Sequence, residues 1–274
     1  MKKFTGFSKI GVIIGVLVVA LIGVATYFVI DGNSKATNYD NYNFYSIIGP
    51  DEHNGNIGDN IKGDKNAPVL VFEYADYQCY YCAQMNPRVN AAIEKADGKL
   101  AVVYRNYLLP YHQNGTAAAT AAQAAGLQGY WKEYSDKLFA NQADWESASG
   151  SERTAIFIKF FEEVTDGKGD TAKFTADLSS KDIAQKIKFD MGIGKRLDVG
   201  GTPAFYVDGQ FIDFSNKNGG EVTIDGKTIT WESSMTGEQF TDLLVRIANI
   251  KTGTETTSET TTEKTTSETT KTDK

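Results

Sequence analysis

The hydrophobic and polar positions change period along the chain, and this change predicts strands alternating with helices. Pro68 to Tyr74 is an apolar, β-branched run, which is typical of a buried strand. Leu100 to Tyr107 is a second such run, placed after the Asp97–Gly98 break. The pattern between them predicts a helix over Cys79 to Ala96. Because such a strand, helix, strand unit crosses over with one hand, we expect the two strands to be parallel.

The middle of the chain has the helical period and many alanine and aromatic residues. We expect helices over Thr116–Leu127, Gly129–Asn141, Glu152–Glu163, Thr171–Ser179 and Ser180–Met191. Their aromatic side chains are most simply the core of a helical insertion at about residues 111–195. They do not indicate a cofactor site.

The strand pattern then resumes. Pro203 to Val207 and Phe211 to Phe214 flank an Asp-Gly turn, which predicts a hairpin. Glu221 to Trp231 contains another Asp-Gly turn. Thr236 and Gln239 have the spacing of a capping box for a closing amphipathic helix. The resulting order is sheet, helical insertion, sheet, helix.

The N-terminus contains a long apolar segment. Ile10 to Ile30 lacks charged residues and is long enough as a helix to cross a membrane. Lysines precede this segment and acidic residues follow it, which leaves residues 1–9 in the cytoplasm. A cleaved signal sequence is the alternative, but the length of residues 10–30 favours an uncleaved anchor. We therefore expect a single-pass protein of the cell membrane whose remaining domain is extracytoplasmic.

The remaining boundaries follow from composition. Residues 31–60 are rich in Asn, Gly and Asp with interspersed aromatic residues, and they are interpreted as a spacer that can pack in part on the domain. Residues 61–250 form the domain. Residues 251–274 are mostly Thr, Ser, Glu and Lys, so this tail is expected to be disordered. A net charge of −7 and a pI near 5.0 argue against a nucleic-acid partner.

Cys79 and Cys82 are the only cysteines. At the start of a helix, the unpaired backbone N–H groups stabilise a thiolate at Cys79, while Cys82 lies one turn further on. The pair can therefore alternate between dithiol and disulfide. A zinc site needs two further ligands, and neither His53 nor His112 has the required spacing. An inert structural disulfide is a second alternative.

Two segments resemble a known family. Phe72 to Cys82 is similar to the active-site strand and turn of the DsbA-like branch of the thioredoxin superfamily, and Gly201 to Gly209 to its cis-proline loop. Arg105 to Pro110, the alanine-rich helix and Leu138 to Trp145 resemble its helical insertion. The resemblance implies an α/β, thioredoxin-like fold. A central mixed sheet would be flanked by helices, with a helical insertion and an N-terminal transmembrane helix added.

The resemblance also implies roles around the dithiol. Cys79 matches the exposed nucleophile of low pKa, and Cys82 matches the buried resolving thiol. Glu73 matches the acidic residue beneath the active site, a candidate proton acceptor for Cys82. Asp76 is interpreted as a cap of the active-site helix. His112 is interpreted as a surface or locally hydrogen-bonded residue.

Substrate contacts are expected on both sides of the nucleophile. Pro203 matches the cis-proline opposite the disulfide, and the backbone of Thr202 would pair with an extended substrate chain. Tyr80 and Tyr81 occupy the dipeptide between the cysteines and are assigned to substrate binding. They replace the Pro-His pair of strongly oxidising members, so the resemblance implies a less oxidising dithiol.

These expectations define a membrane-anchored, extracytoplasmic thiol–disulfide oxidoreductase that introduces disulfides into unfolded or reduced secreted proteins. Its redox group would be the Cys79–Cys82 disulfide, with no other cofactor and no metal. A membrane oxidoreductase or a small-molecule oxidant would regenerate the disulfide. A reductase or isomerase remains an alternative within enzymes. A non-catalytic, anchored binding protein with a structural disulfide is the alternative that is not an enzyme.

Overall fold

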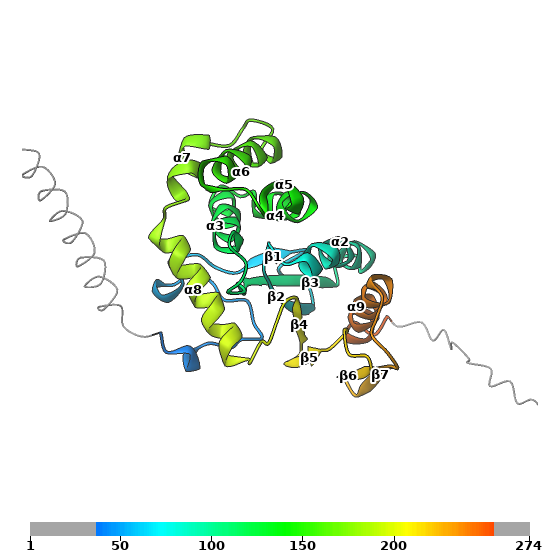
Figure 1. Cartoon of the computed structure of the whole chain (residues 1–274). Helices are drawn as coiled ribbons and strands as arrows, with labels where there is room; N and C mark the ends of the chain where they lie inside the picture. The colour runs from blue at the N-terminus through cyan, green and yellow to red at the C-terminus, as the bar shows by residue number, and fades with distance from the viewer. Residues whose placement is uncertain (1–36, 255–274) are drawn as a thin grey trace, which may run out of the picture. The chain divides into compact units, whose positions relative to one another are not determined.

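The computed structural model describes residues 37–254, and its compact unit begins at Tyr42. Residues 37–41, which contain one short 3-10 helix, η1 (Tyr39–Asn41), belong to a separate unit. The centre of the compact unit is a five-stranded sheet (Figure 1), in the order β1-β3-β2-β4-β5. Its strands are β1 (Asn60–Lys62), β2 (Val69–Ala75), β3 (Leu100–Asn106), β4 (Ala204–Val207) and β5 (Gln210–Ile212). Strands β2 and β3 are parallel, as predicted, and the other pairs are antiparallel.

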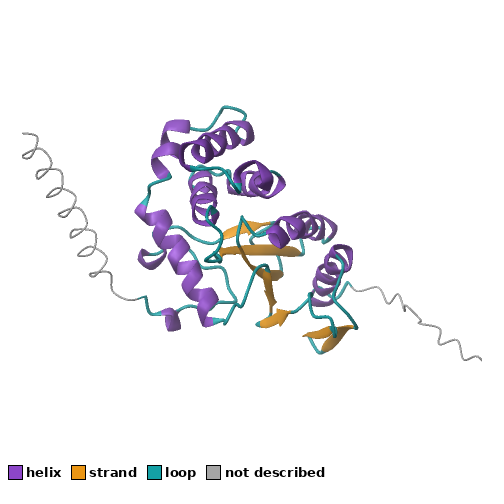
Figure 2. Ribbon diagram, viewed as in Figure 1, coloured by secondary structure: helices purple, strands orange, loops and turns teal. Residues whose placement is uncertain are grey.

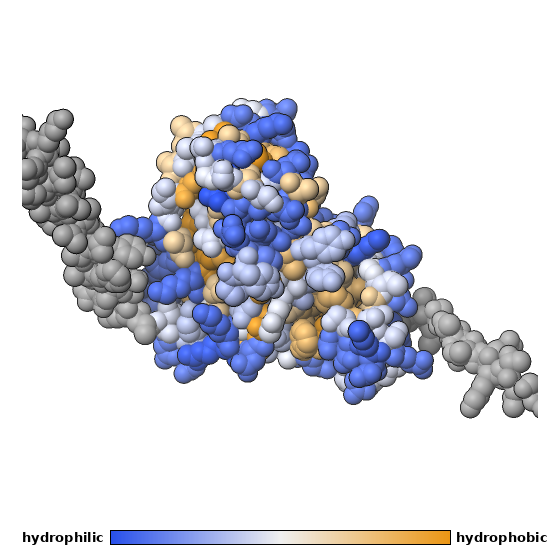
Figure 3. Space-filling view, in the orientation of Figure 1, coloured by the Kyte–Doolittle hydropathy of each residue, from blue (hydrophilic) through white to orange (hydrophobic). Residues whose placement is uncertain are grey.

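Helices cover both faces of the sheet, which explains the continuous apolar runs of β2 and β3. Helices α2 (Tyr80–Lys95) and α9 (Gly237–Lys251) pack with the hairpin β6 (Gly220–Ile224) and β7 (Lys227–Trp231) around one hydrophobic cluster. Cys79, Cys82 and Tyr104 belong to a second cluster, shared with the helical insertion. On the face drawn in Figure 3, hydrophilic residues dominate the surface and hydrophobic ones show between them.

The insertion lies between β3 and β4; in Figure 2 most of its helices lie above the sheet, and the last one runs beside the sheet at the left. Its helices are α3 (Gly115–Gly126), α4 (Trp131–Ala140), α5 (Gln142–Trp145), α6 (Gly150–Val164), α7 (Thr171–Asp177) and α8 (Lys181–Arg196). Phe161 stacks on Phe174 with ring centroids 4.3 Å apart. The Tyr134 hydroxyl donates to the Phe157 carbonyl at 3.0 Å. The aromatic residues thus form the insertion's own core, as expected from their helical spacing.

Residues 42–59, part of the predicted spacer, pack on the domain. Ile48 and Asn54 are buried. Asp51 and Asn54 form a capping box around the short 3-10 helix η2 (Glu52–Asn54). Hydrogen bonding of Asn, Asp and Gly therefore gives this polar segment an ordered path that hydrophobic periodicity does not show.

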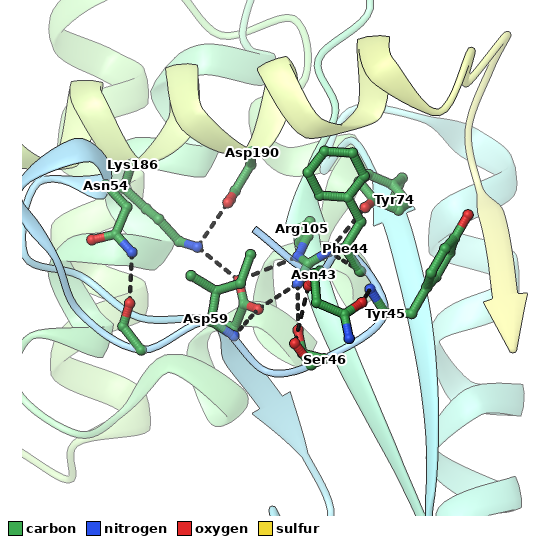
Figure 4. A network of polar contacts seen from close by, with 12 residues as sticks. Asn43, Phe44, Tyr45, Ser46, Asn54, Asp59, Tyr74, Arg105, Lys186 and Asp190 are labelled. Carbon is green, nitrogen blue, oxygen red and sulfur yellow. Dashed lines mark hydrogen bonds and ion pairs between the residues drawn. The ribbon is translucent and has the colours of Figure 1, made fainter. Parts of the chain in front are cut away.

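A buried ion network fastens this segment to the sheet and to α8 (Figure 4). Its members, Asp59, Arg105, Lys186 and Asp190, are fully buried at their side chains. Arg105 pairs with Asp59 at 2.7 Å, and Lys186 pairs with Asp59 at 3.0 Å and with Asp190 at 2.7 Å. Arg105 also donates to the carbonyls of Phe44 and Ser46 and to the hydroxyl of Tyr74. We call these four charged residues the Arg105 network.

The predicted span at residues 10–30 lies outside the described residues, as does the tail from residue 255 onward. Within residues 37–254, no helix combines the length and the apolar character that crossing a membrane requires.

Candidate active site

The two cysteines lie at the N-terminus of α2, where the chain leaves β2. Cys79 is the N-cap residue, with extended backbone angles, and Cys82 lies in the first helical turn. Both are free thiols in this structure. Cys79 is buried, with 5% of its surface exposed, so it is less open than the exposed nucleophile that the resemblance implies, and Cys82 has no exposed surface. The two thiols therefore differ in access, as a nucleophile and a resolving thiol must.

The pKa of Cys79 is lowered to about 6, chiefly by a hydrogen bond from the Cys82 thiol. Burial opposes this change, but the Thr202 hydroxyl and the backbone N–H groups of Tyr81 and Cys82 lower the pKa further. These N–H groups lack helical partners because they lie in the first turn of α2. At neutral pH Cys79 is therefore mostly a thiolate, the form that attacks disulfides.

The pKa of Cys82 is raised well above its ordinary value. Complete burial is the main cause, and the neighbouring Cys79 and Glu73 raise it further. Because the sulfur is removed from water, its negative form is disfavoured. Cys82 therefore needs a local proton acceptor before it can attack and a local proton donor when it leaves.

The loop before β4 brings Thr202 and Pro203 to the nucleophile. The Thr202–Pro203 peptide bond is cis, the isomer that the resemblance implied. The Cys79 sulfur lies 3.3 Å from the Thr202 carbonyl oxygen. The Thr202 hydroxyl is buried and forms no hydrogen bond with another of the described residues in this geometry, so it is available to donate to the Cys79 thiolate. Residues far apart in the sequence thus form one wall of the site.

Glu73 lies on β2 between Tyr104 of β3 and Phe205 of β4, and only 2% of it is exposed. Its pKa is raised to about 7, mainly because burial removes the carboxylate from water. Lys62 opposes this change, whereas Asp136 adds to it. Glu73 can therefore exchange a proton near neutral pH.

Lys62 of β1 carries a buried charge beside Glu73 and is itself fully buried. Its ammonium group pairs with Asp136 of α4 at 2.6 Å and donates to the side-chain oxygens of Asn86 and Asn90. Burial alone would raise the pKa of Asp136, but Lys62 and the two amides lower it to about 2. The Lys62 ammonium group is therefore paired with Asp136, and Glu73 has no counter-ion of its own among the described residues. We call these five residues the Glu73 cluster.

The sequence analysis did not find Lys62 or Asp136. Lys62 belongs to a three-residue strand in a polar segment, and Asp136 lies on an amphipathic helix of the insertion. Only the pairing of β1 with β3 and the packing of α4 on α2 bring them to the site. The residues next to Lys62 and Asp136 in the sequence do not indicate that these two side chains lie at the site.

Asp76 does not cap α2, contrary to expectation, because the helix begins after Cys79 without a side-chain cap. Its buried carboxylate instead accepts from the backbone N–H groups of Gln78 and Leu109 and contacts His112 Nδ1 at 2.8 Å. The locally hydrogen-bonded His112 agrees with expectation. Asp76 thus fastens the active-site turn to the β3–α3 loop. Gly115 lacks a side chain where a Cβ would lie 2.8 Å from Asp76.

Tyr80 and Tyr81 extend into solvent beside the nucleophile, with 63% and 69% of their surfaces exposed. Their rings meet edge to face at 5.5 Å. Exposed aromatic side chains of this kind are suited to contacting an unfolded polypeptide. Among the described residues, no group of three or more His, Cys, Asp or Glu side chains is arranged to hold a metal ion.

Comparison with known proteins agrees with the fold. A family model described as thioredoxin matches residues 56–226, so the chain belongs to the thioredoxin family. The crystal structure of Wolbachia pipientis alpha-DsbA1 superposes with a TM-score of 0.52 at 21% identity, over 71% of this chain and 93% of that one. The prediction of a thioredoxin-like α/β fold with a mixed sheet is thereby confirmed.

Two sets of curated relatives differ in how much of their length matches. The probable disulfide bond formation protein D of Bacillus anthracis is 25% identical over 78% of this chain and 93% of its own length. The Na(+)/H(+) antiporter NhaA 3 of Salinispora tropica is 32% identical over 56% of this chain. This chain covers only 22% of that antiporter. Together with the thioredoxin match, the similarity to the Bacillus anthracis protein confirms the expected resemblance to the DsbA-like branch.

Proposed function

We propose that this protein is a thiol–disulfide oxidoreductase that introduces disulfides into reduced or unfolded secreted proteins. The observation that carries the proposal is the opposite change of the two thiol pKa values, lowered at Cys79 and raised at Cys82. This asymmetry assigns Cys79 as the sulfur that exchanges with the client, because a sulfur stabilised as thiolate is the better leaving group. Cys82 then forms and breaks only the internal disulfide.

In the oxidised protein, a client thiolate attacks the Cys79 sulfur. A client–Cys79 disulfide forms, and the internal disulfide breaks with Cys82 departing as a thiolate. A second client thiolate then attacks the client sulfur of the mixed disulfide, and Cys79 leaves as a thiolate. The client loses two electrons and gains a disulfide, and the two cysteines of the protein become a dithiol.

Glu73 supplies the proton that Cys82 needs. A buried thiolate at Cys82 is unfavourable, so protonated Glu73 would donate as the internal disulfide opens. During regeneration, ionised Glu73 would accept the proton again before Cys82 attacks the mixed disulfide with the oxidant. A pKa of about 7 allows Glu73 to serve in both steps.

The substrate chain would lie between the loop of Thr202 and Pro203 and the exposed rings of Tyr80 and Tyr81. The Thr202 carbonyl is already within 3.3 Å of the reacting sulfur. Main-chain pairing to this loop would accept many sequences, and the tyrosine rings would add apolar contact area.

The low pKa of Cys79 favours oxidation as the direction of reaction. A stabilised thiolate stabilises the dithiol form, which makes the corresponding disulfide more oxidising. This support holds even though Tyr80 and Tyr81 provide no imidazole beside Cys79. A reductase or isomerase would require a potential closer to that of thioredoxin.

The proposed location is the extracytoplasmic side of the cell membrane, with residues 10–30 as an uncleaved anchor. The apolar composition of that segment and the lysines before it support this topology. A membrane oxidoreductase or a small-molecule oxidant would regenerate the disulfide there. Membrane fractionation combined with protease accessibility of the intact cell would test the location. Release of the full-length domain in soluble form would contradict the anchor.

Oxidative refolding of a reduced model protein tests the activity. Cys79→Ala should abolish client oxidation. In Cys82→Ala, the Cys79 thiolate should attack a client disulfide, displace one client thiolate and remain trapped as a mixed disulfide, because the internal thiol that would release the client is gone. Both variants remove one buried sulfur, so each controls for the fold of the other. Full oxidation activity in Cys79→Ala would overturn the proposal.

A further inference from the structure

A groove in the helical insertion lies apart from the dithiol and has a volume of about 370 Å³. Helices α3 and α6 form its walls, and Leu178 closes one side. Its remaining lining combines polar groups with apolar ones: Gln113, Thr116, Ala117, Thr120, Arg153, Thr154 and Phe157. The groove therefore suits a ligand with a polar end and a short apolar stem.

Arg153 is the only ionisable residue in the lining of this groove. One of its terminal nitrogens donates to the Asn114 side chain. Its Nε is buried and has no hydrogen-bond partner among residues 37–254. No carboxylate of the described residues forms an ion pair with it. A guanidinium with a buried, unused donor is suited to bind an anion with two acceptor oxygens.

Two of the other polar groups of the groove already have hydrogen-bond partners. The hydroxyls of Thr120 and Thr154 already donate to carbonyls within their own helices. The positive charge of Arg153 thus has no acidic neighbour in the lining that would repel an incoming carboxylate.

A short chain of hydrogen bonds joins the groove to the dithiol. Arg153 contacts Asn114, whose backbone N–H donates to the Gln78 side chain at 2.6 Å. Gln78 directly precedes Cys79. The groove is therefore close enough to the nucleophile for one extended polypeptide to reach both, since each residue of such a chain spans about 3.3 Å.

We propose that Arg153 and its groove bind an acidic side chain of the client, a few residues from the client cysteine that attacks Cys79. This inference rests on the proposed function. The carboxylate pairs with the guanidinium, and its methylene stem lies against Phe157 and Leu178. Oxidation is therefore faster for cysteines that have a Glu at the matching distance. The ligand is part of the client chain, and a free carboxylate is not sufficient.

The test uses reduced peptides with one cysteine and a single Glu moved from position −5 to position +5, each paired with a Gln peptide. The second-order rate of reaction with the oxidised full-length protein is measured for each. At one or two adjacent positions, the Glu peptide should react about fivefold faster than its Gln partner, as expected for a partly exposed charge pair. Sodium acetate at the same concentration should leave the Gln peptide unaffected.

Three variants make the assignment specific. Arg153→Gln should lose the preference for Glu while reacting normally with Gln peptides, which also shows that the site still folds. Lys95→Gln removes the same charge at the far end of α2 and should keep the preference. Arg153→Glu should instead favour a Lys peptide at the same position.

Equal rates for Glu and Gln peptides at every position would overturn the inference, as would a preference that survives in Arg153→Gln. Acceleration of the Gln peptide by acetate would also overturn it, because the groove would then be a site for free anions. Failure of the oxidised wild type to react with any peptide would instead overturn the proposed function on which the inference rests.

Discussion

The Arg105 network and the Glu73 cluster both bury charged side chains against the same sheet, yet they differ in balance. In the Arg105 network two cations meet two carboxylates, and Arg105 also donates to two carbonyls and a hydroxyl. In the Glu73 cluster one lysine meets two acids, and its direct ion pair is with Asp136. The charges of the Arg105 network therefore balance, whereas in the Glu73 cluster the Glu73 carboxyl has no ion-pair partner of its own among the described residues.

The pKa values follow from this difference. Burial alone would raise the pKa of Asp59, but Lys186 and Arg105 hold it below its ordinary value. Burial raises the pKa of Glu73 to about 7 because Lys62 only partly opposes it. The two neighbouring cations thus keep Asp59 ionised at neutral pH, although burial raises the pKa of Asp190 in the same network. The missing counter-ion allows Glu73 to titrate near neutral pH. A buried charge indicates chemistry only where its compensation is incomplete.

The largest effect is expected from opening the balanced network. Arg105→Met leaves Asp59 with one cation fewer and frees the carbonyls of Phe44 and Ser46, so unfolding should become easier by about 3–5 kcal/mol. Chemical denaturation of the reduced protein measures this loss. The pKa of Cys79 in the folded variant should stay near 6. A loss below about 1 kcal/mol would show that the network contributes little.

Glu73→Gln should act on both stability and chemistry. The folded pKa of Glu73 lies above its unfolded value, so this group favours folding below about pH 4.5 and loses that contribution as the pH rises through about 7. The loss amounts to about 3 kcal/mol, and it should be absent from Glu73→Gln. Denaturation from pH 4 to 8 in a Cys79→Ser, Cys82→Ser background isolates this effect from thiol ionisation.

In the active protein, the same Glu73→Gln change should slow opening of the internal disulfide about 100-fold, because Cys82 loses its proton donor. Stopped-flow measurement of mixed-disulfide formation reports this rate. An unchanged rate would remove Glu73 from the mechanism even if the stability result holds.

Lys62→Met should make the Glu73 cluster less balanced still. The pKa of Glu73 should rise by about one unit, since the cation that opposes its burial is gone. The pH profile of Cys82 attack on a mixed disulfide should move upward with it. Lys132→Met is a matched control, because Lys132 pairs with the same Asp136 from the surface at 3.1 Å. An equal shift in both variants would contradict a specific role of Lys62.

The smallest effect is expected at the Cys79 thiolate itself. Thr202→Val removes the buried hydroxyl and should raise the pKa of Cys79 from about 6 by roughly half a unit. Thr202→Ser keeps the hydroxyl and should leave the pKa nearly unchanged. Thiolate absorbance measured against pH distinguishes the two variants. Identical pKa values of Cys79 in both variants would exclude the Thr202 hydroxyl as a cause of the low pKa.

The sequence predicted the parts of the fold that carry a clear period. The apolar runs of β2 and β3, the helices of the insertion and the capping box at Thr236 and Gln239 all appear in the structure. Their signals are local, since each depends on residues within one element. Strand β1 was missed because three residues, Asn60 to Lys62, are too few to show alternation.

For the site, the sequence identified groups attached to a motif and missed groups that reach it through packing. Cys79, Cys82, Thr202 and Pro203 were found from the Cys-x-x-Cys pair and the Gly-Thr-Pro segment, and the structure brings them together. Glu73 was found by its position before Cys79. Its lysine neighbour arrives from another strand, and no local pattern indicates which distant charge will lie beside it.

The reduction potential of the Cys79–Cys82 pair, measured by equilibration with glutathione, tests the central claim most directly. A stabilised Cys79 thiolate predicts a disulfide clearly more oxidising than that of thioredoxin, which lies at about −270 mV. A value at or below the thioredoxin potential would contradict the account, because a disulfide that resists reduction to that degree cannot oxidise client thiols efficiently.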